Sequence, residues 1–206
     1  IGRARCVVVT GPSGAGKSCL LREVVRHVRE RGERAAVIAC DPASPYTGGA
    51  FLGDRVRWTQ LGEDPGVFVR SVAHREKGGV LPSVVWSMVD LIDAAGYPWV
   101  FVESVGAGQM DGLAVPRPMT RLLVLTPDWG DDMQMLKAGL LERGDLYVVN
   151  KSDLPGSARW ARALAENLGF EAQGEPRVLT VAASTGEGVE ALMKALEKPP
   201  RADARK

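Results

Sequence analysis

GPSGAGKS, residues 11–18, is the stretch on which the fold depends. It fits the pattern G-x-x-x-x-G-K-[ST] in full, and it stands between an apolar run, Cys6–Thr10, and an amphipathic stretch, Ser18–Arg31. A strand, a glycine-rich turn and a helix in this order form a phosphate-binding loop, the P-loop, because glycines let consecutive backbone N–H groups converge on phosphate oxygens. The alternative of an ordinary glycine-rich turn is disfavoured, since both the pattern and its context agree.

The P-loop predicts a role for each of its residues. Lys17 is expected to be catalytic and to bridge the β- and γ-phosphates, and the Ser18 hydroxyl is expected to bind Mg²⁺. A dinucleotide site of the G-x-G-x-x-G type is disfavoured by Lys17 and Ser18. The other nucleotide contacts here are expected from Gly11, Ser13, Gly14, Ala15, Gly16 and Cys19.

Apolar runs alternate with helical patterns along the whole chain, which predicts a three-layer αβα P-loop NTPase G domain with a mostly parallel sheet of about seven strands. The predicted strands are Cys6–Thr10, Ala35–Ala39, Val67–Val72, Trp99–Ser104, Arg121–Thr126, Leu146–Asn150 and Arg177–Ala183. The predicted helices are Ser18–Arg31, Leu81–Ala95, Asp131–Arg143, Ser157–Leu168 and Gly188–Lys198. Ligands of such sheets bind at the carboxyl ends of the strands, so we expect the functional loops there.

Composition places the protein in a broad class. The 206 residues favour one domain, 1–198, followed by a polar tail, 199–206. The net charge of +1 does not favour a nucleic-acid surface, and no apolar run is long enough to span a membrane. Three cysteines without metal-like spacing and the lack of a visible signal peptide predict a cytoplasmic protein.

The run Leu146–Asn150 leads into Asn150-Lys151-Ser152-Asp153, which resembles the N-K-x-D element of P-loop GTPases. The carboxylate of Asp153 can accept from both N1–H and N2–H₂ of guanine, whereas adenine has no such pair of donors. Lys151 can lie over the base plane, and Asn150 can tie this loop to the P-loop. Turn composition alone is the alternative, but the buried strand and the P-loop favour guanine.

A second base-side loop is expected after the last strand. Residues 182–186, AASTG, resemble the S-A-x-x-G element found at that place in GTPases, with Ala182 in place of the serine. The backbone N–H of Ala183 is expected to reach guanine O6. Both alanines are therefore predicted to contact the nucleotide.

Several longer segments together resemble the MeaB/ArgK/MMAA family of P-loop GTPases, within the SIMIBI class. Asp41–Arg55, DPASPYTGGAFLGDR, is similar to D-P-S-S-x-x-T-G-G-x-x-L-G-D-[KR], and Glu103–Gln109, ESVGAGQ, to E-T-V-G-V-G-Q. Phe68–Arg70 with Gly78–Val80 resembles F-I-R…G-G-V, and Gly130–Gly139 resembles G-D-E-x-Q…K-x-G. These matches extend over residues 5–198.

The resemblance implies an Mg²⁺-dependent GTPase that acts as a chaperone of an adenosylcobalamin-dependent acyl-CoA mutase, such as methylmalonyl-CoA mutase. It implies that Asp41, Asp54 and Glu103 join Ser18 around the metal. Asp54, Glu103 and Gly106 are also carried over as catalytic positions, with Gly106 directing its N–H to the γ-phosphate. GTP and GDP are the implied ligands, and hydrolysis is expected to be slow without a partner.

Some segments depart from the family pattern. Residues 110–119, MDGLAVPRPM, replace S-E-x-x-V-A-x-x-V-D and contain two prolines that exclude a simple helix. The family's N-terminal helical extension and C-terminal dimerisation arm have no counterpart in residues 1–206. A homodimer remains an open alternative, but the family's usual route to it is in doubt. Trp58 and Trp129 fall in the predicted switch loops and are candidate client contacts.

Other functions remain as alternatives. A transport-type (LAO/AO) ATPase or kinase would prefer ATP, and Asp153→Ala would leave its nucleotide affinity unchanged. The chain could also be the G domain of a larger fused mutase, as its start at Ile1 suggests. A metallochaperone GTPase related to HypB or UreG would need a Cys/His metal site, which two histidines and three scattered cysteines do not favour.

Overall fold

The structure, a computed structural model, describes residues 3–42, 58–74, 81, 83–104, 119–127, 144–169 and 177–198. At residues 41, 42, 59, 60 and 74 it describes the backbone alone. Among the predicted features, Asp54, Gly106, Trp129 and the helix Asp131–Arg143 lie outside the described residues.

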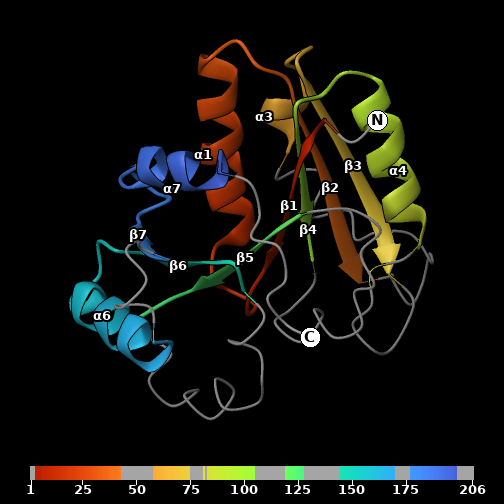
Figure 1. Cartoon of the computed structure of the whole chain (residues 1–206). Coiled ribbons are helices and arrows are strands. Elements are labelled where there is room, and N and C mark those ends of the chain that lie inside the picture. The colour runs from red at the N-terminus through yellow and green to blue at the C-terminus, as the bar shows by residue number, and fades with distance from the viewer. Residues whose placement is uncertain are drawn as a thin grey trace.

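Seven parallel strands form one sheet, as the sequence predicts, and their order is β3-β2-β4-β1-β5-β6-β7 (Figure 1). The strands are β1 (Arg5–Thr10), β2 (Ala35–Pro42), β3 (Val67–His74), β4 (Trp99–Glu103), β5 (Thr120–Leu125), β6 (Leu146–Asn150) and β7 (Val178–Val181). Each predicted strand is present, with ends that differ by up to three residues. The strands are almost continuously apolar because both faces of the sheet are covered.

The helices of the described residues follow the strands. They are α1 (Lys17–Glu30), α3 (Thr59–Gly62), α4 (Ser83–Ala94), α6 (Ser157–Asn167) and α7 (Val189–Leu196). Four of them are the predicted helices with ends that differ by one or two residues. Helix α3 was not predicted, because four residues are too few to show a helical period.

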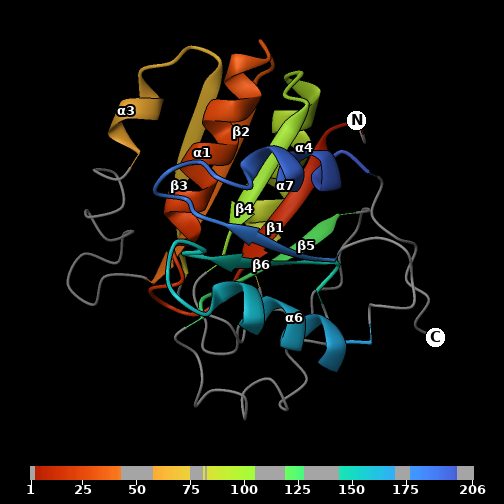
Figure 2. The same cartoon turned by 90° about the vertical axis from the view of Figure 1, so that its left-hand side faces the viewer.

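The sheet separates two helix layers (Figures 1 and 2). On one face, side chains of β1, β4, β5 and β6 pack with α1 and α7. On the other face, α4 covers β1, β2 and β4, and α6 covers β5 and β6. Alternate residues of one strand therefore enter different layers, as Leu122 and Leu123 do in β5.

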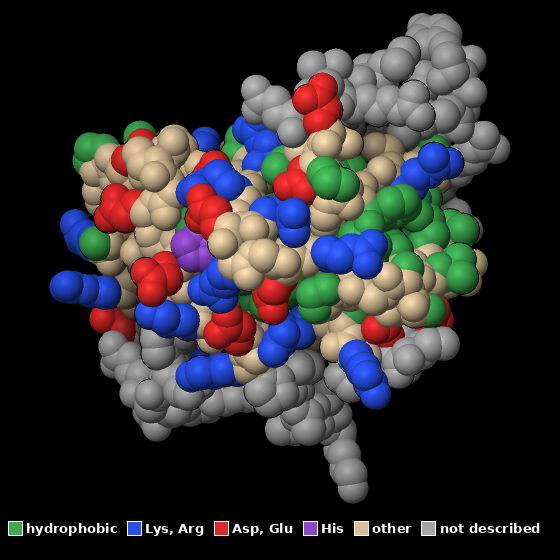
Figure 3. All heavy atoms as spheres, turned by 90° about the horizontal axis from the view of Figure 1, so that it is seen from above, with side chains coloured by type: hydrophobic (Ala, Val, Ile, Leu, Met, Phe, Trp, Pro, Cys, Tyr) green, Lys and Arg blue, Asp and Glu red, His purple; other side chains and the backbone are tan. Residues whose placement is uncertain are grey.

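The sheet order places the P-loop, which follows β1, in the middle of the carboxyl edge. Its neighbours are the ends of β4 and β5, and the ends of β6 and β7 lie farther along the same edge. Seen from above, the surface carries interspersed acidic and basic side chains, with hydrophobic ones gathered at one side (Figure 3). No helix in the described residues has the length and apolar character that crossing a membrane requires.

Candidate functional site

At two glycines of the P-loop the backbone leaves no room for a side chain. Gly11 has φ 147°, and a Cβ there would lie 2.1 Å from the carbonyl oxygen of Val124 in β5. Gly16 has φ 82°, and a Cβ there would lie 2.4 Å from Nδ2 of Asn150. Both values of φ belong to the region that L-residues with a Cβ rarely adopt. The loop is therefore held tightly between β5 and the end of β6.

Lys17 begins helix α1 and is buried at 9% exposure. Its ammonium donates hydrogen bonds of 2.9 Å to the carbonyl oxygens of Gly11 and Pro12. The side chain thus folds back over the loop that it follows. Near the amino end of a fourteen-residue helix, it adds a full positive charge to the partial charge of the helix dipole.

Ser18 and Glu103 meet across the site. The Ser18 hydroxyl donates a 2.7 Å hydrogen bond to Oε1 of Glu103. Glu103 ends β4 and is paired with Val9 of β1 and Ala39 of β2, so it lies at the middle of the carboxyl edge. Two oxygen-bearing side chains, 85 residues apart in the sequence, are thereby brought together beside the P-loop.

Asn150 connects three loops. This residue ends β6 at 2% exposure. Its Nδ2 donates a 2.8 Å hydrogen bond to the carbonyl oxygen of Ala15, and its Oδ1 accepts a 3.1 Å bond from the N–H of Ala183. The side chain therefore ties the end of β6 both to the P-loop and to the loop after β7, as the sequence analysis proposed for the P-loop.

A pocket of 670 Å³ opens beside these loops. Gly16 of the P-loop and Asn150 at the end of β6 form one part of its lining. The loops after β6 and β7 contribute Lys151, Asp153, Leu154, Ala183 and Ser184. Helices α3 and α1 contribute Leu61, Cys19, Arg22, Glu23 and Arg26. Its size is in the range of small-molecule sites. Lys151 has φ 58°, the one positive φ among the non-glycine residues of the described chain.

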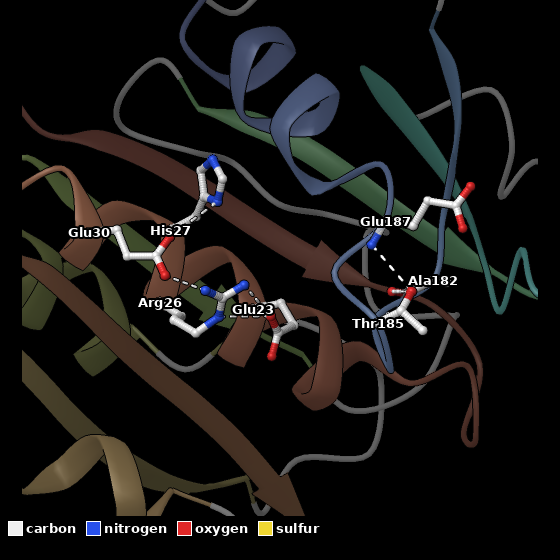
Figure 4. Close-up of polar contacts among 7 residues, drawn as sticks. All are labelled: Glu23, Arg26, His27, Glu30, Ala182, Thr185 and Glu187. Atoms are coloured by element: carbon white, nitrogen blue, oxygen red, sulfur yellow. Dashed lines mark hydrogen bonds and ion pairs between the residues drawn. The ribbon is translucent and has the colours of Figure 1, made fainter.

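The wall formed by α1 is fixed by ion pairs. Arg26 bonds to Glu23 at 2.9 Å and to Glu30, and the turn after β7 lies next to this group (Figure 4). A Cβ on Gly186 would lie 3.5 Å from Nη2 of Arg26. The pocket is therefore bounded on one side by α1 and on the other by the turn that follows β7.

The predicted site residues fall into two groups within the described residues. At the end that is predicted to hold the phosphates, called the phosphate side below, Ser18 contacts Glu103, and Lys17 bonds to the carbonyls of Gly11 and Pro12. The base side comprises Asn150, Lys151, Asp153, Ala182 and Ala183. Asp41 lies near the end of β2, where only its backbone is described, and Asp54 and Gly106 lie outside the described residues.

The N–H of Ala183 donates to Oδ1 of Asn150, and its contact with guanine O6 stays a prediction. One expectation changes. Trp58, a candidate client contact, is 3% exposed and packs in the core with α1, because a large ring stabilises most when it is buried.

The lining residues that the sequence did not predict are Leu61, Arg22, Glu23, Arg26, Leu154 and Ser184. For those on α1 a signal exists: Cys19, Glu23 and Arg26 have the spacing of one helical face that starts at the P-loop. Leu61 lies on the unpredicted helix α3, and no sequence signal marks it.

Comparison with known proteins gives a family. The family described as "Methylmalonyl Co-A mutase-associated GTPase MeaB" matches residues 1–202. A putative GTPase of Pyrococcus horikoshii is 40% identical over 203 residues, which are 96% of this chain and 64% of that protein. A fused isobutyryl-CoA mutase of Cupriavidus metallidurans is 36% identical over 163 residues, 78% of this chain and 15% of that protein.

Solved structures agree with this result. A structure described as an LAO/AO transport system kinase superposes with a TM-score of 0.68 at 28% identity, over 95% of this chain and 58% of that one. The chain spans less than two thirds of the length of the curated GTPases that it matches, at 64%, 48% and 61%.

Proposed function

Because the chain belongs to the MeaB family of methylmalonyl-CoA mutase-associated GTPases, we propose that it is a Mg²⁺-dependent, GTP-hydrolysing chaperone of an adenosylcobalamin-dependent acyl-CoA mutase. Membership of a GTPase family implies guanine-nucleotide binding. The metal, the chaperone role and the client are the proposed parts.

The observation that carries the proposal is the 2.7 Å contact between Ser18 and Glu103. Mg²⁺ prefers hard oxygen ligands and is typically held by one or two protein oxygens together with phosphates and waters. A serine hydroxyl beside a carboxylate, next to a P-loop, is such a donor set. Ser18 would bind the ion, and Glu103 would orient Ser18 and a metal-bound water. Asp41 and Asp54 remain proposed members of the same shell.

Bound Mg²⁺ would neutralise charge on the β- and γ-phosphates. The chain itself supplies positioning. The N–H groups of residues 13–19 would hold phosphate oxygens, and Lys17 would exchange the carbonyls of Gly11 and Pro12 for the β- and γ-phosphates. Gly106 is proposed to donate its N–H to the γ-phosphate. Phosphoryl transfer to water needs little covalent chemistry from the protein, so this positioning is its main contribution.

Guanine selection is proposed to rest on Asp153, which is exposed to the pocket. Its carboxylate can accept from N1–H and N2–H₂ of guanine at once. Lys151 lies in the same pocket, where its stem can cover one face of the base.

The proposed client, an acyl-CoA mutase, is inferred from the proteins to which this chain is similar. The family is described as mutase-associated, and the fused mutase of Cupriavidus metallidurans contains a segment similar to 78% of this chain. A domain that is joined to a mutase in one protein is a reasonable separate partner of a mutase in another. The fused mutase also supports the alternative that this chain is the G domain of a larger mutase.

Titration calorimetry with GDP, a non-hydrolysable GTP analogue and the matching adenine nucleotides, with and without Mg²⁺, tests the nucleotide part. We expect guanine nucleotides to bind at least about 100-fold more tightly than adenine nucleotides, and chelation of the metal to weaken the GTP analogue more than GDP. Equal or tighter binding of the adenine nucleotides would favour the transport-type ATPase instead.

The client part needs a second measurement. GTP turnover is followed while a purified adenosylcobalamin-dependent acyl-CoA mutase is titrated in. The variant Lys17→Met, whose GTP hydrolysis should be strongly reduced, is the control. We expect turnover to rise with the mutase, because a partner can order the loops around the γ-phosphate. Unchanged turnover together with no detectable complex in sedimentation would refute the chaperone proposal and leave the GTPase assignment intact.

A further inference from the structure

The exposed large hydrophobic side chains of the described residues all belong to β3 and α4. They are Phe68 at 38% exposure, Val84 at 50% and Leu91 at 71%. In Figure 3, hydrophobic side chains gather on the side of the molecule where Figure 1 shows α4. Exposed apolar groups that gather on one side of a protein mark a site of interaction, so this side is a candidate interface.

The apolar side chains of α4 lie on the flank that faces β3. The N–H of Ala4, which precedes β1, donates to Oδ1 of Asp93 at 3.0 Å, so the Asp93 flank of α4 faces β1. Val84 lies nine residues before Asp93, about two and a half helical turns, and therefore projects from the opposite flank. Leu91 follows Val84 by seven residues and continues the same stripe. Because β3 and β1 lie on opposite sides of β2 and β4, this apolar flank faces β3.

Strand β3 is an edge of the sheet and lacks the usual protections of an edge. Among the strands of the described residues it pairs with β2 alone, in an unbroken register from Val67 to His74. It contains no proline, no lysine and no bulge, whereas β7, at the opposite edge, is only four residues long. Such an edge offers a row of backbone N–H and C=O groups to one more strand.

The side chains along this edge are complementary to a second copy of the same strand. Phe68 packs against Tyr97 with ring centroids 6.3 Å apart and keeps part of its ring exposed. Arg70 projects from the same face two residues farther on, is exposed, and forms no ion pair within the described part of the chain. If two β3 strands pair antiparallel about Val69, Phe68 of each copy lies opposite Arg70 of the other. A guanidinium over an aromatic ring is a favourable pair, and the symmetry forms it twice.

We infer that two copies of this chain associate through β3 and the apolar flank of α4, about a two-fold axis at Val69. The pairing joins the two seven-stranded sheets into one. A two-fold axis perpendicular to the sheet leaves both α4 helices on the same face, one on each side of the axis, with their apolar flanks directed at each other above Phe68. The contact is closed, because each copy uses its one unprotected edge. None of these residues lines the pocket, so the pocket of each copy stays open.

The size of the contact sets its expected strength. The eight residues of β3 extend about 26 Å and the twelve residues of α4 about 18 Å, which places the contact at the small end of specific interfaces. We therefore expect the dimer to dissociate on dilution, with half dissociation between about 1 and 100 μM.

Sedimentation velocity of the 206-residue chain, from about 200 μM down to 1 μM, tests the association. Val84→Glu should raise the dissociation constant at least about tenfold, because the charge is forced into an apolar contact. Ser83→Glu is the matched control: it adds the same charge in the same first turn of α4, from an exposed position about 100° farther round the helix, and should stay within about twofold of the parent. GDP affinity and circular dichroism should be unchanged in both variants.

A second experiment tests the pairing about Val69. Phe68→Lys places like charges opposite each other and should weaken the dimer at least about tenfold. Adding Arg70→Glu to that variant converts the pair into an ion pair of opposite signs, and the dissociation constant should return to within about threefold of the parent. A failure to return, in a double variant that is folded by circular dichroism, would overturn this pairing.

Three outcomes would overturn the dimer itself. One is a chain that remains monomeric at about 200 μM. Another is a dimer that Val84→Glu and Ser83→Glu weaken equally, since the contact would then lie elsewhere. The third is a monomeric chain whose binding to a purified acyl-CoA mutase is lost in Val84→Glu and kept in Ser83→Glu, which would assign this surface to that partner instead of a second copy.

Discussion

The phosphate side and the base side of the candidate site differ in how their polar groups are used in the structure, which holds no nucleotide. At the phosphate side, the functional groups are bonded to one another: Lys17 to the carbonyls of Gly11 and Pro12, and Ser18 to Glu103. At the base side, the side chain of Asn150 makes the hydrogen bonds that join the loops, and Asp153 and Ser184 line the pocket.

The difference shows where binding requires rearrangement. A phosphate has to compete with protein acceptors for Lys17, whereas a base finds its donors and acceptors directed at the pocket. We therefore expect the base side to dominate selectivity among nucleosides and the phosphate side to dominate catalysis, in which changes of partner are part of the reaction.

The largest expected effect is at the phosphate side. Lys17→Met keeps the aliphatic stem and removes the charge, so GTP hydrolysis should fall by about 10²–10³-fold, the range found when one preorganised charge-stabilising donor is removed. Single-turnover hydrolysis measures the fall. Lys151→Met, at the base side, is the matched control and should change hydrolysis far less. Equal losses in the two variants would contradict the division between the two sides.

The second-largest effect is expected at the base side, for the variant Asp153→Asn. The amide cannot accept from both N1–H and N2–H₂, so GDP affinity should fall by about 100-fold. Xanthine carries an oxygen at position 2, to which the new amide can donate, so xanthosine diphosphate should bind more tightly than it does to the parent. Calorimetry with both nucleotides measures the exchange. An unchanged GDP affinity would instead favour the ATPase alternative.

Glu103→Gln should have a smaller effect, confined to the metal. The amide keeps the size of the side chain but loses the charge that orients Ser18, so the Mg²⁺ concentration for half-maximal hydrolysis should rise about 10–100-fold. GDP affinity measured without Mg²⁺ should be nearly unchanged. A loss of GDP affinity without the metal would indicate that Glu103 supports the P-loop itself.

The smallest effect is expected for the ion pair between Arg29 and Asp64, which does not line the pocket. Arg29 hydrogen-bonds to Asp64 at 2.9 Å, and this bond, with one from the N–H of Gly66, holds the pKa of the Asp64 carboxyl below its ordinary 3.8. The stabilisation is therefore present above pH 3.8 and is lost as the pH falls through the lowered pKa.

Asp64→Asn should lower the melting temperature at pH 7 by about 1–3 °C, since a partly exposed ion pair contributes little. The difference from the parent should shrink as the pH falls below 3.8 and through the lowered pKa of the folded state, because below that pKa the carboxyl is protonated in both states. GDP affinity should not change. Thermal scans between pH 7 and pH 3 measure the first effect, and a change in GDP affinity would show that this contact reaches the site.

Much of the fold was predictable because parallel strands buried on two faces are nearly continuous in hydrophobicity. Leu146–Asn150 was located to the residue, whereas the ends of β2 and β7 were shifted, since their last residues are polar or belong to turns. The order of the strands was not predicted, because no local pattern encodes which strand lies beside β1.

The site was predictable as far as motifs define side chains. Ser18 and Glu103 meet as the two motifs together suggested, and Asp153 faces the pocket. The donation of the Ala183 N–H to Asn150 could not be foreseen, because it depends on how three loops approach one another. The burial of Trp58 could not be predicted for a similar reason, because a position in a predicted loop does not show whether the side chain packs into the core.

The close approach of Gly16 to Asn150 has a consequence for sequence variation. A side chain at position 16 would collide with the amide that holds the carbonyl of Ala15 and the N–H of Ala183. Since Gly16 also has φ 82°, a side chain there is strained even where Asn150 is replaced by a smaller residue. A library in which both positions are randomised should therefore return glycine at position 16 whatever residue stands at position 150.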